Sequence, residues 1–256
     1  MLSEGDGLMI TLMASLPAQG MYALASAYGG LVARLVFQPI EETSRNYFGK
    51  LLSTIDGPPS FASIQSAKRD LTRLLKVYSL LSTFAVVVGP TAAPVLLKLV
   101  VGARWSDCGA GDLLAKYCFY IPLLAFNGVL ESFVSVVATE AQLRRQSAWM
   151  LGFSLVFAAS GYIFLHQLDL GAAGLLYANM VNMAVRIGWC FVFITRYLRR
   201  HNTKISMSEV MPIWSTMALS AGTSSILYQK KHHSKRGDFH ELVWLGSISA
   251  GFLILL

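Results

Sequence analysis

The sequence contains little charge. Only 14% of its 256 residues are Asp, Glu, Lys or Arg, whereas a soluble globular domain carries about 25%. Hydrophobic residues make up 54% of the chain, and the mean hydropathy is +0.53. A compact soluble fold of this composition would leave large apolar patches in contact with water. The composition therefore excludes an ordinary soluble domain and predicts an all-α polytopic membrane protein.

Motifs that carry covalent or cofactor chemistry are also missing. Cysteine occurs three times, at Cys108, Cys118 and Cys190, without a CxxC pair or the Cys/His spacing of zinc sites. The sequence contains no P-loop, dinucleotide fingerprint, HExxH motif or nucleophile elbow. It also lacks the Asp-rich motif of a polyprenyl-phosphate transferase, and its five histidines lie in or near predicted loops. We therefore expect no metal, no cofactor and no enzymatic activity.

Apolar runs of about 20 residues predict the membrane spans. The first long apolar region is expected to break near Pro17–Gly20 or Gly29–Gly30, and Gly89-Pro90 with Pro94 predicts a kink. Both ends of the sequence run into apolar segments, so we interpret the chain as a fragment of a longer protein. We expect one bundle of seven to eight helices, with spans near 8–28, 31–52, 71–101, 113–139, 148–165, 172–195, 210–227 and 242–256.

The basic residues lie mostly in connectors between the apolar runs. The net charge is +7, but no nucleic-acid-binding motif accompanies it, so we expect no nucleic-acid partner. Alternating spans would place ten Lys and Arg residues on one side and seven on the other. The positive-inside rule favours the cytoplasm for the larger group, although the Lys230–Arg236 cluster argues against it. The larger group is Lys68, Arg69, Arg73, Lys76, Arg144, Arg145, Arg196, Arg199, Arg200 and Lys204.

One group of polar side chains lies beside strongly apolar sequence. A charge at bilayer depth costs about 2.5–3.5 kcal/mol, so these side chains should face a polar cavity or pair internally, as Arg34 could with Gln38 or Glu41. Pro39 removes a backbone hydrogen bond nearby. For Arg34 we favour a cavity; for the later residues the alternative is that the helix reaches the headgroups. The group consists of four residues at a helical spacing of i, i+4, i+7 and i+11: Arg34, Gln38, Glu41 and Arg45. Glu42 lies beside them.

Two further polar groups fall within predicted spans. Asn179, Asn182 and Arg186 stand at i, i+3 and i+7, and Asn127 and Glu131 stand at i and i+4. For Asn179 and Asn182, hydrogen bonds between helices, worth about 0.6 kcal/mol each, compete equally with ligand contacts, whereas for Arg186 we favour a site. Glu131 either neutralises an arginine or is protonated through desolvation. Arginine binds phosphate bidentately and amides suit sugar hydroxyls, so we predict a cavity for an anionic, hydroxyl-rich ligand.

Three stretches carry a resemblance to a known family. "GGLVARLVFQPIEE" at 29–42, "FNGVLESF" at Phe126–Phe133 and "LLYANMVNMAVRI" at Leu175–Ile187 resemble the Rft family of endoplasmic-reticulum membrane proteins. That family belongs with the multidrug/oligosaccharidyl-lipid/polysaccharide exporters. The resemblance covers the whole chain and matches the C-terminal half of a family member. It implies a multi-pass location in the endoplasmic-reticulum membrane and an exporter fold of two helix bundles, one of them supplied by a missing N-terminal half.

The resemblance also implies a function. Family members are linked to moving the Man5GlcNAc2-diphosphodolichol intermediate to the lumenal leaflet for N-glycosylation, so the implied partners are membrane lipid and a dolichol-diphosphate-linked oligosaccharide. A non-transporting accessory or scaffold protein of that pathway, or an exporter of organic cations that uses Glu131, stays open as an alternative. Arg34 and Arg186 would bind the diphosphate, and the polar cavity would be shaped by Gln38, Glu41, Glu42, Asn127, Glu131, Asn179 and Asn182.

Overall fold

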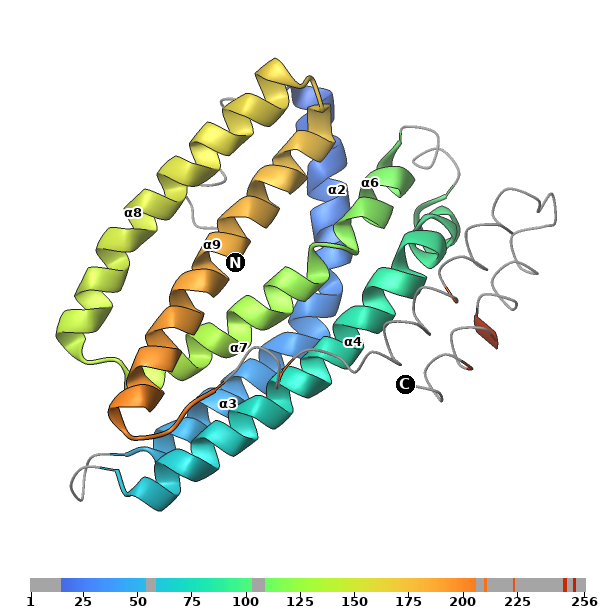
Figure 1. The fold of residues 1–256 in the computed structure, drawn as a ribbon. Coiled ribbons are helices and arrows are strands. Elements are labelled where there is room, and N and C mark those ends of the chain that lie inside the picture. The colour runs from blue at the N-terminus through green and yellow to red at the C-terminus, as the bar shows by residue number, and fades with distance from the viewer. Residues whose placement is uncertain are drawn as a thin grey trace.

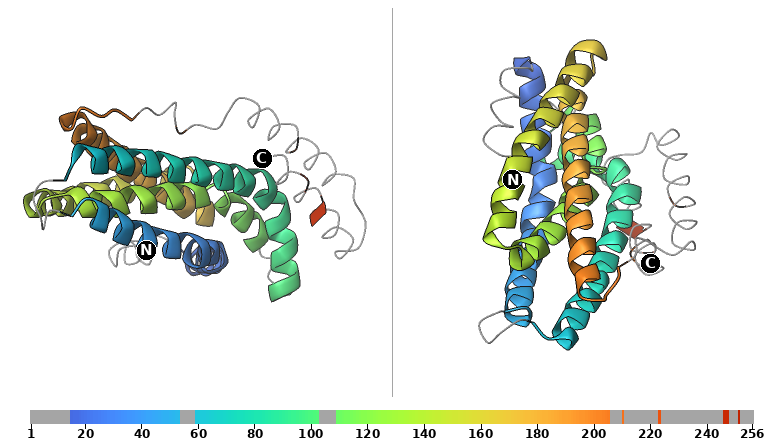
Figure 2. Two further views of the ribbon diagram at one scale, coloured as in Figure 1. Left: turned by 90° about the horizontal axis from the view of Figure 1, so that it is seen from below. Right: turned by 60° about the vertical axis from the view of Figure 1, so that its left-hand side comes forward.

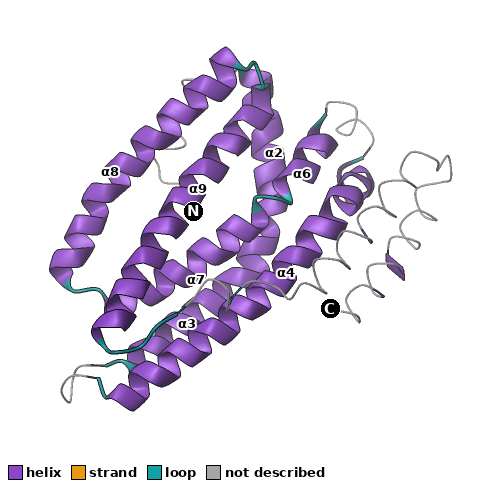
Figure 3. Ribbon diagram, in the orientation of Figure 1, coloured by secondary structure: helices purple, strands orange, loops and turns teal. Residues whose placement is uncertain are grey.

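The computed structural model describes residues 15–53, 59–102 and 109–205, together with the isolated positions 210, 223, 246, 247 and 251. No strand occurs in these ranges, so the predicted all-α class is confirmed for them (Figure 1, Figure 3). The elements are α2 (Leu16–Val32), the π-helix η1 (Ala33–Phe37), α3 (Gln38–Leu51), α4 (Phe61–Val101), α6 (Ala110–Tyr117), α7 (Ile121–Val137), α8 (Glu140–Tyr162), the π-helix η2 (Ile163–Gln167) and α9 (Gly171–Arg200).

The described helices are long enough to cross a membrane. Four qualify by length and hydropathy, Leu16–Leu51, Phe61–Val100, Glu140–Gln167 and Gly171–Arg200, and α6 with α7 forms a fifth candidate bent by 41°. The predicted spans near 8–28 and 31–52 fall into the single helical run Leu16–Leu51. The predicted spans 210–227 and 242–256 lie outside the residues that the structure describes, apart from isolated positions. The expected count of seven to eight helices therefore stays a prediction.

The first long helix has no break at Gly29–Gly30, the second of the two predicted positions. Pro17 lies in the first turn of α2, where proline is tolerated. Gly29 is buried against the ring of Tyr117, and a Cβ at Gly29 would overlap that ring. Close packing on α6 thus keeps the Gly29–Gly30 pair helical. The interruption is instead the π turn η1, just before Pro39, whose missing N–H cannot bond back to the preceding turn.

Helix α7 occupies the centre of the bundle. It packs against α3, α4 and α9, while α8 packs mainly on α9 and α2 crosses α6 and α9 (Figure 2). Phe48 of α3 and Phe133 of α7 are buried edge to face, with ring centroids 5.0 Å apart. The start of α4, the start of α8 and the end of α9 lie at one end of the bundle (Figure 1). The basic residues of these termini therefore gather at one end, as alternating spans predict.

Helix α4 bends where the sequence predicts a kink. Pro90 and Pro94 lie inside it, and its C-terminal part turns away from its N-terminal part (Figure 2). Just before the prolines, Gly89 approaches the turn between α6 and α7. A Cβ at Gly89 would lie 2.6 Å from Sγ of Cys118 and 2.8 Å from its Cβ. The contact between α4 and this turn therefore depends on the absence of a side chain at Gly89.

We predict that Gly89→Ala destabilises the protein, because the added methyl group cannot fit without moving Cys118. Overpacking of this kind costs about 1–3 kcal/mol. The melting temperature of the protein purified in detergent measures the effect. Gly20→Ala is the control, since nothing lies within 4 Å of a Cβ built at this helical glycine. Equal melting temperatures for the two variants would contradict the packing argument.

Candidate functional site

An ion pair joins α7 to α9 in the middle of both helices. Nη2 of Arg186 donates to Oε1 of Glu131 at 2.6 Å, and the two side chains are 14% and 25% exposed. Nδ2 of Asn127, one turn earlier on α7, donates to the other oxygen of Glu131 at 3.1 Å. The predicted neutralisation of Glu131 by an arginine is therefore confirmed, and Arg186 is that arginine.

Glu41 of α3 approaches the same ion pair. Its carboxylate lies against Gly128 of α7, where a Cβ would overlap the carboxylate oxygens. Gly128 lies between Asn127 and Glu131, so the missing side chain lets a second carboxylate reach this part of α7. Glu41 also interacts electrostatically with Glu131 and with Arg45, one turn further along α3. Acidic and basic groups from three helices thus meet here.

Several buried polar atoms near the ion pair have no hydrogen-bond partner among the described residues. Asn182, one turn before Arg186 on α9, is 3% exposed. Within the described part of the chain, Oδ1 of Asn127, Oδ1 of Asn182 and Nε of Arg186 are buried without a hydrogen-bond partner. Buried polar atoms are nearly always hydrogen-bonded in folded proteins, so this place suits a polar ligand or water. We name the following five residues the polar cluster: Glu41, Asn127, Glu131, Asn182 and Arg186.

Asn179 lies outside the polar cluster. Its side chain is fully buried, and its Nδ2 donates to the hydroxyl of Tyr22 at 2.8 Å and to the carbonyl of Leu175 at 3.2 Å. The first of these bonds joins α9 to α2, which is the interhelical role that the sequence left open. In this conformation Asn179 offers its amide nitrogen to a neighbouring helix and not to a ligand, although its Oδ1 also has no hydrogen-bond partner among the described residues.

The other predicted site residues form an exposed row on η1 and α3. Arg34 donates from Nη2 to the carbonyl of Ala27 at 3.1 Å, and Gln38 donates from Nε2 to Oε1 of Glu42 at 3.1 Å. The predicted pairing of Arg34 with Gln38 or Glu41 is therefore wrong. The predicted stripe also divides: Glu41 lies against Gly128 of α7, while Arg34, Gln38 and Glu42 stay exposed. We name these three residues the exposed row.

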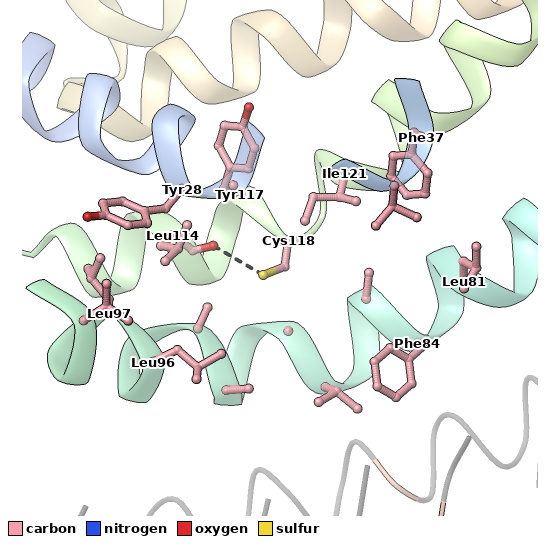
Figure 4. A pocket seen from close by; sticks show the side chains of 18 residues that line it. Tyr28, Phe37, Leu81, Phe84, Leu96, Leu97, Leu114, Tyr117, Cys118 and Ile121 are labelled. Atoms are coloured by element: carbon pink, nitrogen blue, oxygen red, sulfur yellow. Dashed lines mark hydrogen bonds between the residues drawn. The ribbon is translucent and has the colours of Figure 1, made fainter. Parts of the chain in front are cut away.

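An apolar cavity of about 490 Å³ lies beside η1 (Figure 4). Its walls come from α2 and η1, from α4, and from α6 and the turn after it; Phe37, Leu96, Tyr117 and Cys118 are among its lining residues. Sequence reasoning missed this cavity, although small residues at helical spacing in α4 were a signal for it: Ala85, Gly89, Ala92 and Ala93. No group of three His, Cys, Asp or Glu side chains that could hold a metal ion occurs among the described residues.

The arrangement defines a class of protein. Several helices long enough to cross a membrane surround a charged cluster in mid-helix, as in membrane proteins with an intramembrane polar site. A family model described as "Rft protein" matches residues 1–256, and the chain therefore belongs to the Rft family. The resemblance inferred from the sequence motifs is thus confirmed. No solved structure matches the chain.

Curated relatives carry one common name, Man(5)GlcNAc(2)-PP-dolichol translocation protein RFT1. The chain is 38% identical to the protein of this name from Yarrowia lipolytica, and the match covers 88% of this chain and 34% of the relative. It is 35% identical to that of Saccharomyces cerevisiae, covering 89% and 39%. It is 33% identical to that of Schizosaccharomyces pombe, covering 100% and 46%. The chain thus spans between a third and a half of the length of these relatives.

We predict that Glu131→Ala destabilises the protein by about 3 kcal/mol, because it leaves the charge of Arg186 buried and uncompensated. Arg186→Met alone should also destabilise, because it strands the carboxylate of Glu131. The double variant Glu131→Ala/Arg186→Met should lose less than the sum of the two single losses. Chemical denaturation of the detergent-purified protein measures all three values. Additive losses would show that the two charges are not coupled.

Proposed function

We propose that the protein containing this chain takes part in moving a dolichol-diphosphate-linked oligosaccharide across the endoplasmic-reticulum membrane for N-glycosylation. The polar cluster is the observation that carries the proposal. It places charges and unpaired amide oxygens in mid-helix, in a member of a family whose curated relatives are named for translocation of that lipid. A transporter of a glycolipid needs polar groups at this depth, whereas a passive anchor does not.

Arg34 is proposed as the main phosphate ligand. Its guanidinium is exposed, and the described structure gives it one hydrogen bond, to a backbone carbonyl. A guanidinium has five N–H donors, so most of them stay available for a bidentate contact with phosphate. The charge of Arg186 is already compensated by Glu131, so a phosphate that binds Nη2 competes with that carboxylate. Arg186 is therefore proposed as a second ligand, used only when α7 and α9 move relative to each other.

The amides and acids are proposed to contact the sugar hydroxyls. Gln38 and Glu42 of the exposed row are accessible in this conformation, whereas Asn127 and Asn182 of the polar cluster are buried. Access to the cluster requires rearrangement of the helices, which alternating access between two bundles supplies. We propose that the rest of the longer protein forms the second bundle. Glu41 would shift the charge balance of the cluster, and Asn179 would act indirectly by holding α2 against α9.

The apolar cavity is proposed to hold part of the isoprenoid chain. Its lining includes Val36 and Phe37 of η1, the same π turn that carries Arg34. A polyprenyl diphosphate needs a cation for its phosphates and an apolar surface for its chain at neighbouring positions. The structure provides both within one turn of helix, which supports an amphiphilic substrate of this class.

We predict that Arg34→Gln in the full-length protein lowers transport about tenfold or more, since a hydrogen bond to a charged group is worth about 1.5–3 kcal/mol. Cells lacking the family protein and expressing the variant should underglycosylate a reporter protein and accumulate the lipid-linked intermediate. Arg34→Lys should lose less, because it keeps the charge. Arg144→Gln is the control, because it removes an exposed arginine of α8 that does not line the apolar cavity. Normal glycosylation by Arg34→Gln at wild-type expression would refute the assigned role.

Reconstitution separates transport from an accessory role. Purified full-length protein in liposomes should move a labelled Man5GlcNAc2-diphosphodolichol between leaflets, and Arg34→Gln should slow this movement. If the wild-type protein rescues cells but moves no labelled lipid in liposomes, the protein is an accessory or scaffold of the pathway and the transport proposal fails.

A further inference from the structure

A second cavity of about 490 Å³ lies between α8 and α9, at the end of the bundle where α8 begins and α9 ends. It shares no residue with the polar cluster or the apolar cavity. Because α8 packs mainly on α9, its far side faces away from the described bundle (Figure 1). We name this cavity the α8–α9 groove; it is lined by Gln142, Arg145, Trp149, Phe153, Val185, Gly188, Trp189, Val192, Phe193, Arg196, Tyr197 and Arg200.

The lining of the groove changes from basic to apolar along its length. On α8, Arg145 is followed at helical spacing by Trp149 and Phe153, so the three side chains share a face. Since α8 and α9 are antiparallel, Arg196 and Arg200 of α9 lie at the same end as Arg145. From Gln142 to Phe153, eleven residues along α8, the groove extends about 16 Å from that end. A groove with a cationic end and apolar walls fits a ligand with an anionic head and a hydrocarbon chain.

The three arginines of the groove have no acidic partner among the residues that the structure describes. The ion pairs of the described residues join Arg69 and Arg73 to Asp70 and Arg186 to Glu131. Within the described part of the chain, Arg145, Arg196 and Arg200 therefore have no carboxylate at ion-pair distance. This contrasts with Arg186, whose charge is neutralised inside the protein. Unneutralised guanidinium groups that share one groove form a site for a phosphate.

The position along the helices places this end at lipid headgroups. The run Glu140–Gln167 has 28 residues, which corresponds to about 42 Å of helix against a hydrocarbon core of about 30 Å. The first turn of α8 and the last turn of α9 therefore extend beyond the hydrocarbon. Trp149 lies about one turn deeper than Arg145, and Trp189 about two turns deeper than Arg196; tryptophan is enriched near membrane interfaces. Basic pockets between spanning helices at this depth suit anionic headgroups.

We propose that the α8–α9 groove binds an anionic glycerophospholipid of the surrounding bilayer. Arg145, Arg196 and Arg200 contact its phosphate, and one acyl chain lies along Trp149, Phe153 and Trp189 towards Val185. The site is separate from the translocation path proposed above and does not depend on it. A zwitterionic lipid binds more weakly, because its quaternary ammonium group is repelled by the three guanidinium groups. The volume of the groove lies within the range of small-molecule sites, about 300–1,000 Å³.

The test is equilibrium binding of a fluorescent phosphatidylserine to the full-length protein purified in neutral detergent. Arg145→Gln/Arg200→Gln should weaken binding about tenfold or more. Arg144→Gln/Arg199→Gln is the matched control: it removes the same charge one residue away on the same two helices, from side chains that do not line the groove. This control should change the affinity less than about twofold. Arg145→Lys/Arg200→Lys keeps the charge and should bind with intermediate affinity.

Four results would overturn the proposal. Equal losses in the two Gln double variants would mean attraction to a charged surface and no defined groove. Displacement of the lipid by millimolar inorganic phosphate, or equal affinity for phosphatidylcholine, would mean that no anionic lipid is selected. Absence of phosphatidylserine binding to the wild-type protein would mean that another segment of the longer chain covers the groove. Melting temperatures measured without lipid should agree among all variants, and where a Gln double variant unfolds, the Lys double variant provides the comparison.

Discussion

The ion pair between Glu131 and Arg186 is the interaction on which the rest of the structure depends. Either charge alone would be costly in the middle of helices this apolar, and only the contact between α7 and α9 neutralises both. The pair also organises its neighbours: Asn127 orients the Glu131 carboxylate, Asn182 lies one turn from Arg186, and Glu41 reaches α7 through the space left by Gly128. Because α7 also packs on α3 and α4, this one contact fixes the centre of the bundle.

Arg186 and Arg34 differ in whether a carboxylate compensates their charge. Arg186 is paired with a carboxylate, so a ligand anion binds there only by exchange with Glu131. Arg34 lies on the exposed surface of a π turn and donates to a backbone carbonyl, which leaves its charge unneutralised by any acidic group at ion-pair distance in the described part of the chain. π turns occur frequently at functional sites, and this one places Arg34 beside the apolar cavity. The two arginines thus differ in whether an anion meets a compensated or an uncompensated guanidinium.

Part of this arrangement follows from sequence alone, because it depends on spacing within one helix. Asn127 and Glu131 are one turn apart, so their proximity was predictable. Contacts between helices were not predictable, and the sequence therefore left open whether Glu131 is neutralised by an arginine or protonated. Gly29 stays helical because of the Tyr117 ring, and Glu41 turns inward because of Gly128. The apolar cavity combines segments of α2, α4 and α6 that are far apart in the chain, so the small residues of α4 mark only one of its walls.

The position of each basic residue along its helix separates two kinds of anion contact. A phosphate that reaches the polar cluster loses its hydration and meets an arginine whose charge Glu131 already compensates, so under the proposed function the contact belongs to a transient step. A phosphate at the α8–α9 groove keeps part of its water and meets arginines without acidic partners, so the contact adds to existing interactions without replacing any. Screening by salt is strong at exposed helix ends and weak at buried pairs. Under the two proposals, arginines at a helix end therefore hold a resident lipid, whereas an arginine in mid-helix contacts the substrate only transiently.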